Sequence, residues 1–403
     1  MNEPEPALDL ARLRAYRLQR VREQLKSREL AGVLLYDPIN IRYATGSVNQ
    51  AVWTLHNPAR YAFVPTEGGV VLFEFHGCAH LADGLETISE VRPATSWFYF
   101  VAGPRVEEKT VGWAREIVEL VTLAGGPRKK RLAVDKCDPM GSAALRSLGV
   151  ELFDGQEILE QARAIKSPDE LIQMRAAVSV CEQGMTAMRE ALRPGMTESQ
   201  LWSILHQVNI ANGGEFIETR LLTSGSRTNP WFQECSARVI EAGDLVSFDT
   251  DLIGPYGMCA DISRTFLCGD SKPTDEQSRL YGLAMTQIHH NMNILAPGVT
   301  LREMAHQAWQ LPPPCLPNRY AVVIHGVGMC DEYPYCPYRE DFDSAGYDGT
   351  LLPGMTVCVE SYVGEAGGLE GVKLEQQVLI TDSGVELLSG FPFEERLCGS
   401  RWI

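Results

Sequence analysis

Five residues in the C-terminal half of the chain have the types and the placement of a metal site built from carboxylates. Each lies in a short apolar run that is typical of a β-strand, and they are Asp251, Asp261, His325, Glu360 and Glu375. Carboxylates are seldom buried unless something compensates their charge, and a cation is the strongest compensation. A solvated charge at a strand end is the simpler interpretation of each residue alone. Together, the five predict a pair of divalent ions such as manganese, iron, cobalt or zinc.

The aspartates can be checked against the period of a strand. Asp249 and Asp251 lie two residues apart, so both are expected to project from one face of the strand 245–251. The turn Gly254–Gly257 then allows a hairpin to bring Asp261 opposite them. Both Asp249 and Asp251 are therefore candidate ligands.

Composition limits the classes of function. A chain of 403 residues that is 45% hydrophobic can form two ordinary domains with substantial cores. Its formal net charge of −16 argues against nucleic acid or an anionic membrane as a partner. No apolar segment resembles a membrane span or a signal peptide, which predicts a soluble, cytoplasmic protein. The eleven cysteines are expected to be reduced thiols that mostly fill the core.

The elements that must position the site fall into two parts. Up to about residue 165, an amphipathic helix at 10–28 is followed by alternating strands and helices, which indicates an α/β domain with a mixed sheet. The expected strands are 32–36, 61–64, 69–74 and 131–134, and the expected helices are 110–122 and 142–148. A boundary is expected near Lys166, because Ser167-Pro168-Asp169-Glu170 has the residues that start a helix.

The second part contains a weak internal repeat. The segments 192–200 and 295–303 both contain a Pro-Gly break followed by a capping box, from Thr197 to Gln200 and from Thr300 to Glu303. This pattern favours a domain of two similar halves. Two other segments are not expected to belong to the site. The basic run 128–131 is expected to be a surface loop, and the sequence indicates no role for residues 399–403.

The order of these segments resembles the methionine aminopeptidase, prolidase and creatinase family, which has the pita-bread fold. The resemblance rests on the phrases Ala31–Leu35, Pro38–Gly46, Ala164–Ile172 and His325–Gly328, together with the candidate metal ligands. It implies an α/β (α+β) protein with a creatinase-like N-terminal domain at 1–165. A pita-bread catalytic domain with pseudo-two-fold halves is expected to follow at 166–403.

Three positions depart from the peptidases of this family. Asp261 lies ten residues after Asp251 and twelve after Asp249, which differs from the usual spacing and leaves open which aspartate bridges the metals. Asp331 stands near the place of a second histidine, and Trp231 takes the place of another. Peptide hydrolysis needs donors that stabilise an oxyanion and protonate the leaving amine, and these residues supply neither well. The site is therefore expected to keep its metals and to catalyse a different reaction.

A metal, a carboxylate base and aromatic walls suit the elimination of a sulfonium group. A metal can bind a substrate carboxylate, a carboxylate base can remove the neighbouring proton, and aromatic faces attract an onium cation. In these features the chain resembles the bacterial dimethylsulfoniopropionate lyases of the metallopeptidase-like family. The resemblance implies iron, a homodimer and six metal ligands, which are Asp249, Asp251, Asp261, His325, Glu360 and Glu375.

The same resemblance implies roles for residues around the metals. Asp331 matches the general base, and Tyr320 lies at a further position implicated in the site. Trp231 and Tyr333 are candidates for binding the substrate, although each could also be a packing residue. Trp53 is a candidate for a residue that reaches the active site of a neighbouring subunit.

The sequence thus predicts a metal-dependent carbon–sulfur lyase that cleaves dimethylsulfoniopropionate into dimethyl sulfide and acrylate. Two other classes of function stay open at this point. An Xaa-Pro dipeptidase or aminopeptidase-like metallohydrolase would explain the metal ligands, but not the replaced histidines. The other class is a non-catalytic pita-bread module that binds a partner, and the presence of all the metal carboxylates argues against it.

Overall fold

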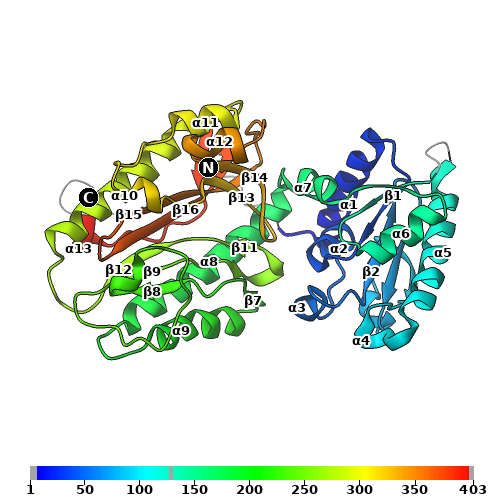
Figure 1. Ribbon diagram of the computed structural model, residues 1–403, viewed down its shortest axis with the longest axis horizontal. Helices are drawn as coiled ribbons and strands as arrows, with labels where there is room; N and C mark the ends of the chain where they lie inside the picture. The colour runs from blue at the N-terminus through cyan, green and yellow to red at the C-terminus, as the bar shows by residue number, and fades with distance from the viewer. Residues whose placement is uncertain (1–6, 127–129, 399–403) are drawn as a thin grey trace. The chain divides into compact units, whose positions relative to one another are not determined.

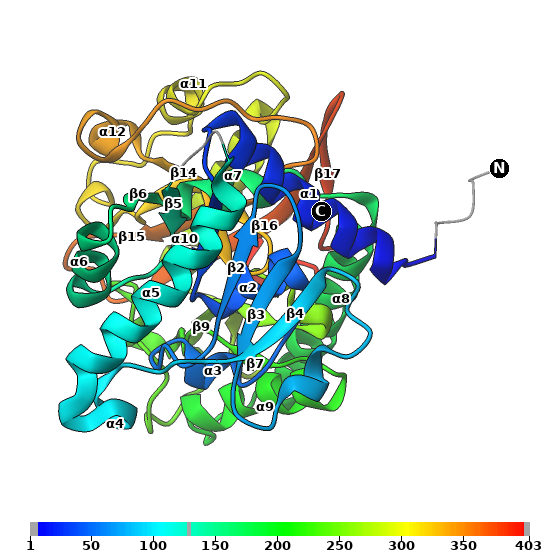
Figure 2. The same cartoon turned by 90° about the vertical axis from the view of Figure 1, so that its right-hand side faces the viewer.

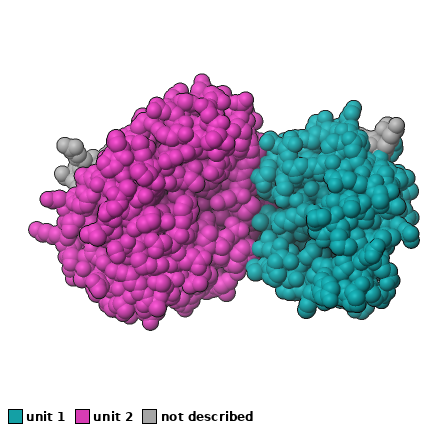
Figure 3. Space-filling model, in the orientation of Figure 1, with its two compact units in different colours: residues 1–163 teal, residues 164–403 magenta. Residues whose placement is uncertain are grey.

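A computed structural model describes residues 7–126 and 130–398 of the chain. The chain divides into two compact units, residues 1–163 and residues 164–403, which are coloured separately in Figure 3. Two residues of the basic run, 128 and 129, and all of residues 399–403 lie outside the described residues. Within the described ranges, no helix is long and apolar enough to cross a membrane.

The N-terminal unit is built on one six-stranded sheet with the order β4-β3-β2-β1-β5-β6 (Figures 1 and 2). Strand β1 pairs antiparallel with β2 and parallel with β5, so the sheet is mixed, as predicted. Its strands are β1 (Gly32–Leu35), β2 (Tyr61–Pro65), β3 (Val70–Glu74), β4 (Ile88–Pro93), β5 (Arg131–Val134) and β6 (Glu151–Asp154).

Helices pack on this sheet through apolar stripes. The longest, α5, buries Trp113, Ile117 and Val121 in a core that also contains Phe63 and Leu132 of the sheet. The helices of this unit are α1 (Leu10–Ser27), α2 (Pro38–Thr45), α3 (Ala51–Thr54), α4 (Tyr99–Ala102), α5 (Val106–Gly125), α6 (Pro139–Ser147) and α7 (Gln156–Arg163). The sequence predicted the elements β1, β2, β3, β5, α1, α5 and α6, with differences of a few residues at their ends, and it did not predict β4, β6, α2 or α7.

The C-terminal unit contains a five-stranded sheet with the order β14-β13-β15-β16-β17 and two three-stranded sheets, β12-β9-β8 and β11-β10-β7. The large sheet consists of β13 (Val322–Val327), β14 (Asp331–Pro337), β15 (Thr356–Gly364), β16 (Gly371–Thr381) and β17 (Gly384–Leu387). The small sheets consist of β7 (Phe216–Ile217), β8 (Leu222–Ser224), β9 (Leu245–Phe248), β10 (Leu252–Ile253), β11 (Cys259–Ala260) and β12 (Arg264–Leu267). Most of these strands are buried along their whole length, which suits a site enclosed by protein.

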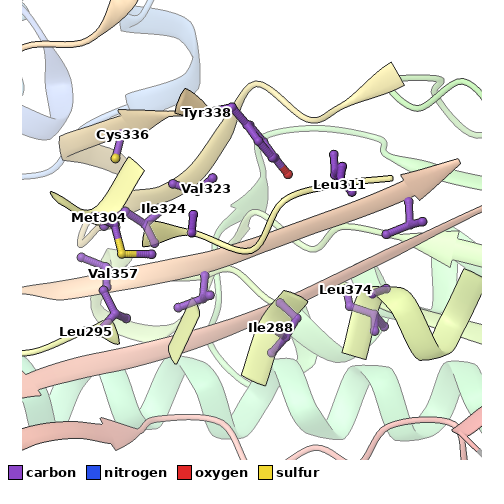
Figure 4. Close-up of a cluster of buried hydrophobic side chains, with 14 of the residues drawn as sticks. Ile288, Leu295, Met304, Leu311, Val323, Ile324, Cys336, Tyr338, Val357 and Leu374 are labelled. Carbon is purple, nitrogen blue, oxygen red and sulfur yellow. The ribbon is translucent and has the colours of Figure 1, made fainter. Parts of the chain in front are cut away.

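The helices of this unit confirm the predicted capping signals. Each N-cap side chain bonds the N3 backbone in a capping box at Ser167, Thr197 and Thr300. The helices are α8 (Pro168–Ala191), α9 (Glu198–Ala211), α10 (Asp275–Ile294), α11 (Leu301–Gln307), α12 (Arg339–Ala345) and α13 (Glu395–Cys398). Figure 4 labels Ile288 of α10 together with Val357 and Leu374 of the large sheet, which belong to one hydrophobic core. This core makes the sheet a rigid base for the side chains on its other face.

One prediction about the strands is wrong. A continuous strand from 245 to 251 was expected, but β9 ends at Phe248. Asp251 has a φ of 35°, a left-handed conformation that breaks a strand. The hairpin that follows is formed as predicted, with Leu252 opposite Ala260, and it brings Asp251 next to Asp261. A strained backbone at a candidate ligand is typical of a functional site.

Candidate metal centre

Six acidic and imidazole side chains converge in the C-terminal unit, and we call them the cage. Two follow β9, one lies between β11 and β12, and three project from β13, β15 and β16; they are Asp249, Asp251, Asp261, His325, Glu360 and Glu375. Each is at least nine-tenths buried. Their ligand atoms form overlapping groups in which all atoms lie within 4.8 Å of one another. The structure therefore brings together all six predicted ligands.

The imidazole of His325 lies at the centre of three carboxylates. Its Nε2 is 3.2 Å from Oε1 of Glu360, 3.5 Å from Oδ2 of Asp261 and 3.6 Å from Oε1 of Glu375. Strand pairing fixes part of this geometry, because Glu360 of β15 lies directly opposite Glu375 of β16. Like charges opposite each other destabilise a sheet unless something compensates them.

The cage fits divalent ions by two observations. Oε1 of Glu375 is buried and has no hydrogen-bond partner among the described residues, which is costly for a carboxylate that binds nothing. Burial, and then the neighbouring carboxylates, raise the pKa of Asp251 and of Asp261 well above the usual value for aspartate. A cation would remove this repulsion, and the set of oxygen donors with one imidazole suits a divalent transition metal.

One cation of the protein itself enters the cage, and the sequence analysis missed it. The ammonium of Lys373 lies 2.6 Å from Oε2 of Glu360, 3.1 Å from Oδ2 of Asp249 and 3.5 Å from Oε2 of Glu375. It also donates to Oγ of Ser263 at 2.6 Å. Burial lowers the pKa of Lys373, but these carboxylates outweigh burial and hold the pKa well above its usual value. Lys373 was detectable, because it lies two residues before Glu375 on one strand and so shares its face.

Lys373 distinguishes the two aspartates whose roles the sequence left open. Asp249 is held by the ammonium of Lys373 and by Oγ of Ser263, at 2.7 Å from its Oδ1. Asp251 forms no ion pair with Lys373. Its Oδ2 instead accepts a hydrogen bond from Oγ1 of Thr219 at 2.5 Å. Burial raises the pKa of Asp249 to about 7, with Lys373 acting in the opposite direction. The single positive charge of Lys373 thus offsets part of the negative charge of the cage, and it contacts Asp249 but not Asp251.

Replacing Lys373 with methionine should lower the free energy of unfolding of the metal-free protein by about 3–5 kcal/mol, the usual effect of leaving a buried charge unpaired. The loss should be smaller in metal-loaded protein, because the metals then compensate the carboxylates. Urea unfolding of chelator-treated and metal-loaded samples measures both values. Arg302→Met is the control, because Arg302 pairs with Asp343 on the surface and should change stability little. Equal stability of the Lys373→Met and wild-type proteins without metal would contradict this role.

Asp331 lies at the open side of the cage. It is the first residue of β14, and its Oδ1 is 3.6 Å from Nδ1 of His325. More than half of its side chain, 55%, is exposed, whereas the cage carboxylates are buried. Burial of its surroundings raises the pKa of Asp331, and the imidazole of His325 acts against that increase. An accessible carboxylate beside the candidate ligands has the position that a general base requires.

Two predicted aromatic residues lie beside Lys373. The centroid of the Tyr320 ring is 4.6 Å from Nζ of Lys373, and that of Trp231 is 6.0 Å away. Burial raises the pKa of Tyr320 well above its usual value, so its phenol stays protonated. Trp231 is buried against the ring of Tyr362, and Phe232 stacks on Tyr320 with its own side chain exposed. Trp231 therefore packs in the wall of the site as well as facing it.

The remaining candidates have less direct connections to the cage. Tyr333 lies two residues after Asp331 in β14, and its ring stacks on Tyr347 at 5.9 Å. Trp53 belongs to the N-terminal unit, where its ring packs edge-on against Phe75 at 5.6 Å. Their roles in substrate binding stay predictions. One cysteine also lies here: Sγ of Cys358 is within 4.8 Å of ligand atoms of Asp261, His325 and Glu375.

Comparison with protein families covers nearly the whole chain. Residues 172–382 match the metallopeptidase family M24, and residues 17–165 match the creatinase/prolidase N-terminal domain. The predicted combination of a creatinase-like N-terminal part and a pita-bread part is confirmed.

Two similar proteins are both named dimethylsulfoniopropionate lyase DddP. The protein of Roseovarius nubinhibens is 43% identical over 396 residues, which cover 97% of this chain and 89% of the relative. The protein of Roseobacter denitrificans is 41% identical over 97% of this chain and 88% of its own length.

Solved structures with the same fold are more distant in sequence. An Xaa-Pro dipeptidase from Bacillus anthracis has a TM-score of 0.74 at 20% identity and covers 94% of this chain and 99% of its own. The dipeptidase PepE from Mycobacterium ulcerans has a TM-score of 0.74 at 21% identity and covers 96% of this chain and 98% of its own. At this identity, the likeness shows the fold alone.

Proposed function

The chain belongs to metallopeptidase family M24 and, within it, to the group of the dimethylsulfoniopropionate lyases DddP, and we propose that it cleaves dimethylsulfoniopropionate into dimethyl sulfide and acrylate. The observation that carries this proposal is the position of Asp331. An accessible carboxylate stands 3.6 Å from the cage histidine, beside a complete set of candidate metal ligands. Headspace detection of dimethyl sulfide from the purified protein tests the proposal.

We propose that the cage holds one or two divalent ions, with iron expected and manganese, cobalt or zinc as the alternatives. The residues that would hold them are Asp249, Asp251, Asp261, His325, Glu360 and Glu375. When bound, such an ion supplies a Lewis acid that binds the substrate carboxylate and stabilises negative charge on the carbon beside it. Lys373 adds a fixed positive charge beside Asp249 and Glu360.

Asp331 removes the proton from the carbon next to the substrate carboxylate. The electron pair of that C–H bond forms the new double bond of acrylate. The C–S bond breaks, and its electrons stay on sulfur, which leaves as neutral dimethyl sulfide. Asp331 holds the proton and then releases it to solvent through its exposed side.

Aromatic residues orient the substrate. Trp231 and Tyr333 are proposed to contact the sulfonium end, since ring faces attract an onium cation. Tyr320 acts as a hydrogen-bond donor rather than a base, because burial keeps its hydroxyl protonated. It supports the reaction by holding the substrate in place.

The proposal assigns a role to each part of the chain. Residues 166–403 form the catalytic domain, and residues 1–165 form the creatinase-like domain, in a cytoplasmic homodimer. Tyr99 and Phe100 of α4 are exposed aromatic side chains, and they support the proposal that this surface of the N-terminal unit contacts another subunit. Trp53 is proposed to bind substrate at the partner's active site.

Xaa-Pro dipeptides are expected to be poor substrates or not to be cleaved. Asp331 and Trp231 replace the histidines of the peptidases, so the site lacks good donors for an oxyanion and a leaving amine. Release of free proline from a panel of Xaa-Pro dipeptides, measured on metal-loaded protein, checks this expectation. An authentic prolidase assayed in parallel is the control. Turnover comparable to that of the prolidase would show that the two replacements do not prevent peptide hydrolysis.

A further inference from the structure

A buried ion pair lies beside Asp331, in a part of the C-terminal unit that the proposed reaction does not use. The ammonium of Lys166 contacts Oε1 of Glu332, and the side chains are only 2% and 0% exposed. Lys166 lies in the phrase that opens the C-terminal unit, and 166 residues separate it from Glu332. Its backbone is also fixed, because its N–H donates to the carbonyl of Gly354 at 2.9 Å.

Glu332 and Asp331 are neighbours that point in opposite directions. Along the first residues of β14, Asp331 is exposed and Glu332 is buried, which is the alternation expected of a strand. Holding the side chain of Glu332 therefore also fixes the direction in which Asp331 projects.

The surrounding hairpin is shaped to admit this carboxylate. A Cβ at Gly328 would collide with the carboxylate of Glu332, so the glycine provides the space that Glu332 fills. The pairing of β13 with β14 changes register between His325 and Gly326, where β14 has extra residues. A ladder with such an irregularity does not by itself fix the position of Asp331 relative to His325.

We propose that the Lys166–Glu332 pair is a positioning pair that sets the carboxylate of Asp331 at its place beside His325. This inference rests on the proposed function, in which Asp331 is the base. A buried ion pair is costly to desolvate and adds little net stability, but it can specify one conformation. Misplacing a reacting group by about 1 Å can cost as much as a hundredfold in rate, so the pair would act on turnover.

The test is a comparison of single and double methionine variants. Lys166→Met or Glu332→Met alone should lower the melting temperature, because each leaves one buried charge unpaired. The double variant removes both charges and should regain most of the stability. Its turnover number for dimethyl sulfide release should nevertheless stay about ten- to a hundredfold below wild type, with the Michaelis constant little changed. The acid limb of its pH profile should also move, and Lys166→Arg should retain activity.

A matched control uses the buried pair Arg60–Glu74 of the N-terminal unit, whose side chains are each 1% exposed. Its double methionine variant should show a change in stability without the loss of turnover number. Glu332→Gln, which keeps the size of the side chain, replaces the double variant if that protein does not fold.

A crystal structure of the variant gives a readout that does not depend on turnover. The Asp331–His325 distance of 3.6 Å should increase or become heterogeneous. A stable double variant with wild-type turnover, or with Asp331 unmoved, would overturn the positioning role and leave the lyase proposal standing. An inactive wild-type protein would overturn the lyase proposal, and the crystallographic comparison would still decide whether the pair positions Asp331.

Discussion

Replacing Asp331 with asparagine is expected to lower the turnover number for dimethyl sulfide release by at least about a hundredfold, the usual scale for loss of a general base. Asparagine keeps the size and polarity of the side chain but cannot accept the proton. Metal content and fold should change little, because Asp331 stands outside the buried cage. Steady-state kinetics with elemental analysis of the same samples checks both statements.

The control for this substitution is Asp343→Asn, at a side chain that is 91% exposed on the surface. It should leave turnover unchanged. The pH dependence gives a second check: a base acts only when deprotonated, so activity should be present above the pKa of Asp331 and lost as the pH falls through it. Because that pKa is raised, the acid limb should lie above the usual range of an aspartate. Full activity of Asp331→Asn with normal metal content would contradict the assignment of Asp331 as the base.

Removing the metal is expected to abolish activity and to lower the melting temperature. The five carboxylates of the cage would then repel one another, and among the described residues the ion pairs that compensate them come from Lys373 and His325. Bound metal stabilises the fold by about 2.7 kcal/mol when its free concentration is a hundred times its dissociation constant. Chelation, followed by thermal unfolding and by reconstitution with iron, manganese, cobalt or zinc, measures both effects.

Variants of two glutamates make this experiment specific. Glu375→Gln removes a buried cage oxygen and should reduce the metal content, whereas Glu386→Gln, on the exposed strand β17, should retain it. Full activity of a preparation that elemental analysis shows to be free of metal would contradict the assignment of the cage.

The residues of the cage were predictable because they lie in or beside elements with simple sequence patterns, namely apolar strands and a hairpin turn. His325, Glu360 and Glu375 each lie within a buried strand, where a polar side chain must have a partner. The hairpin turn Gly254–Gly257 was also readable, and it places Asp261 beside Asp251. The helix starts at Ser167, Thr197 and Thr300 were correct for the same reason, since a capping box is a local signal.

Other features depend on contacts between distant segments. Asp251 has a left-handed backbone conformation, which aspartate tolerates better than most residues, but the apolar run before it gave no signal of the break. The ion pair between Lys166 and Glu332 joins two segments that are far apart in the sequence, and no local sequence pattern predicts it. Lys373 is an intermediate case: its face follows from the strand period, but the carboxylates that surround it come from three different strands or strand ends.

The most direct test of the account is to incubate purified, metal-loaded protein with dimethylsulfoniopropionate and to measure headspace dimethyl sulfide and dissolved acrylate together. We expect the two products in equal amounts, their formation to depend on metal, and no release of dimethyl sulfide above background from the Asp331→Asn sample on the same timescale. No dimethyl sulfide from metal-loaded wild-type protein, with rapid cleavage of Xaa-Pro dipeptides by the same preparation, would contradict the lyase function and favour a peptidase.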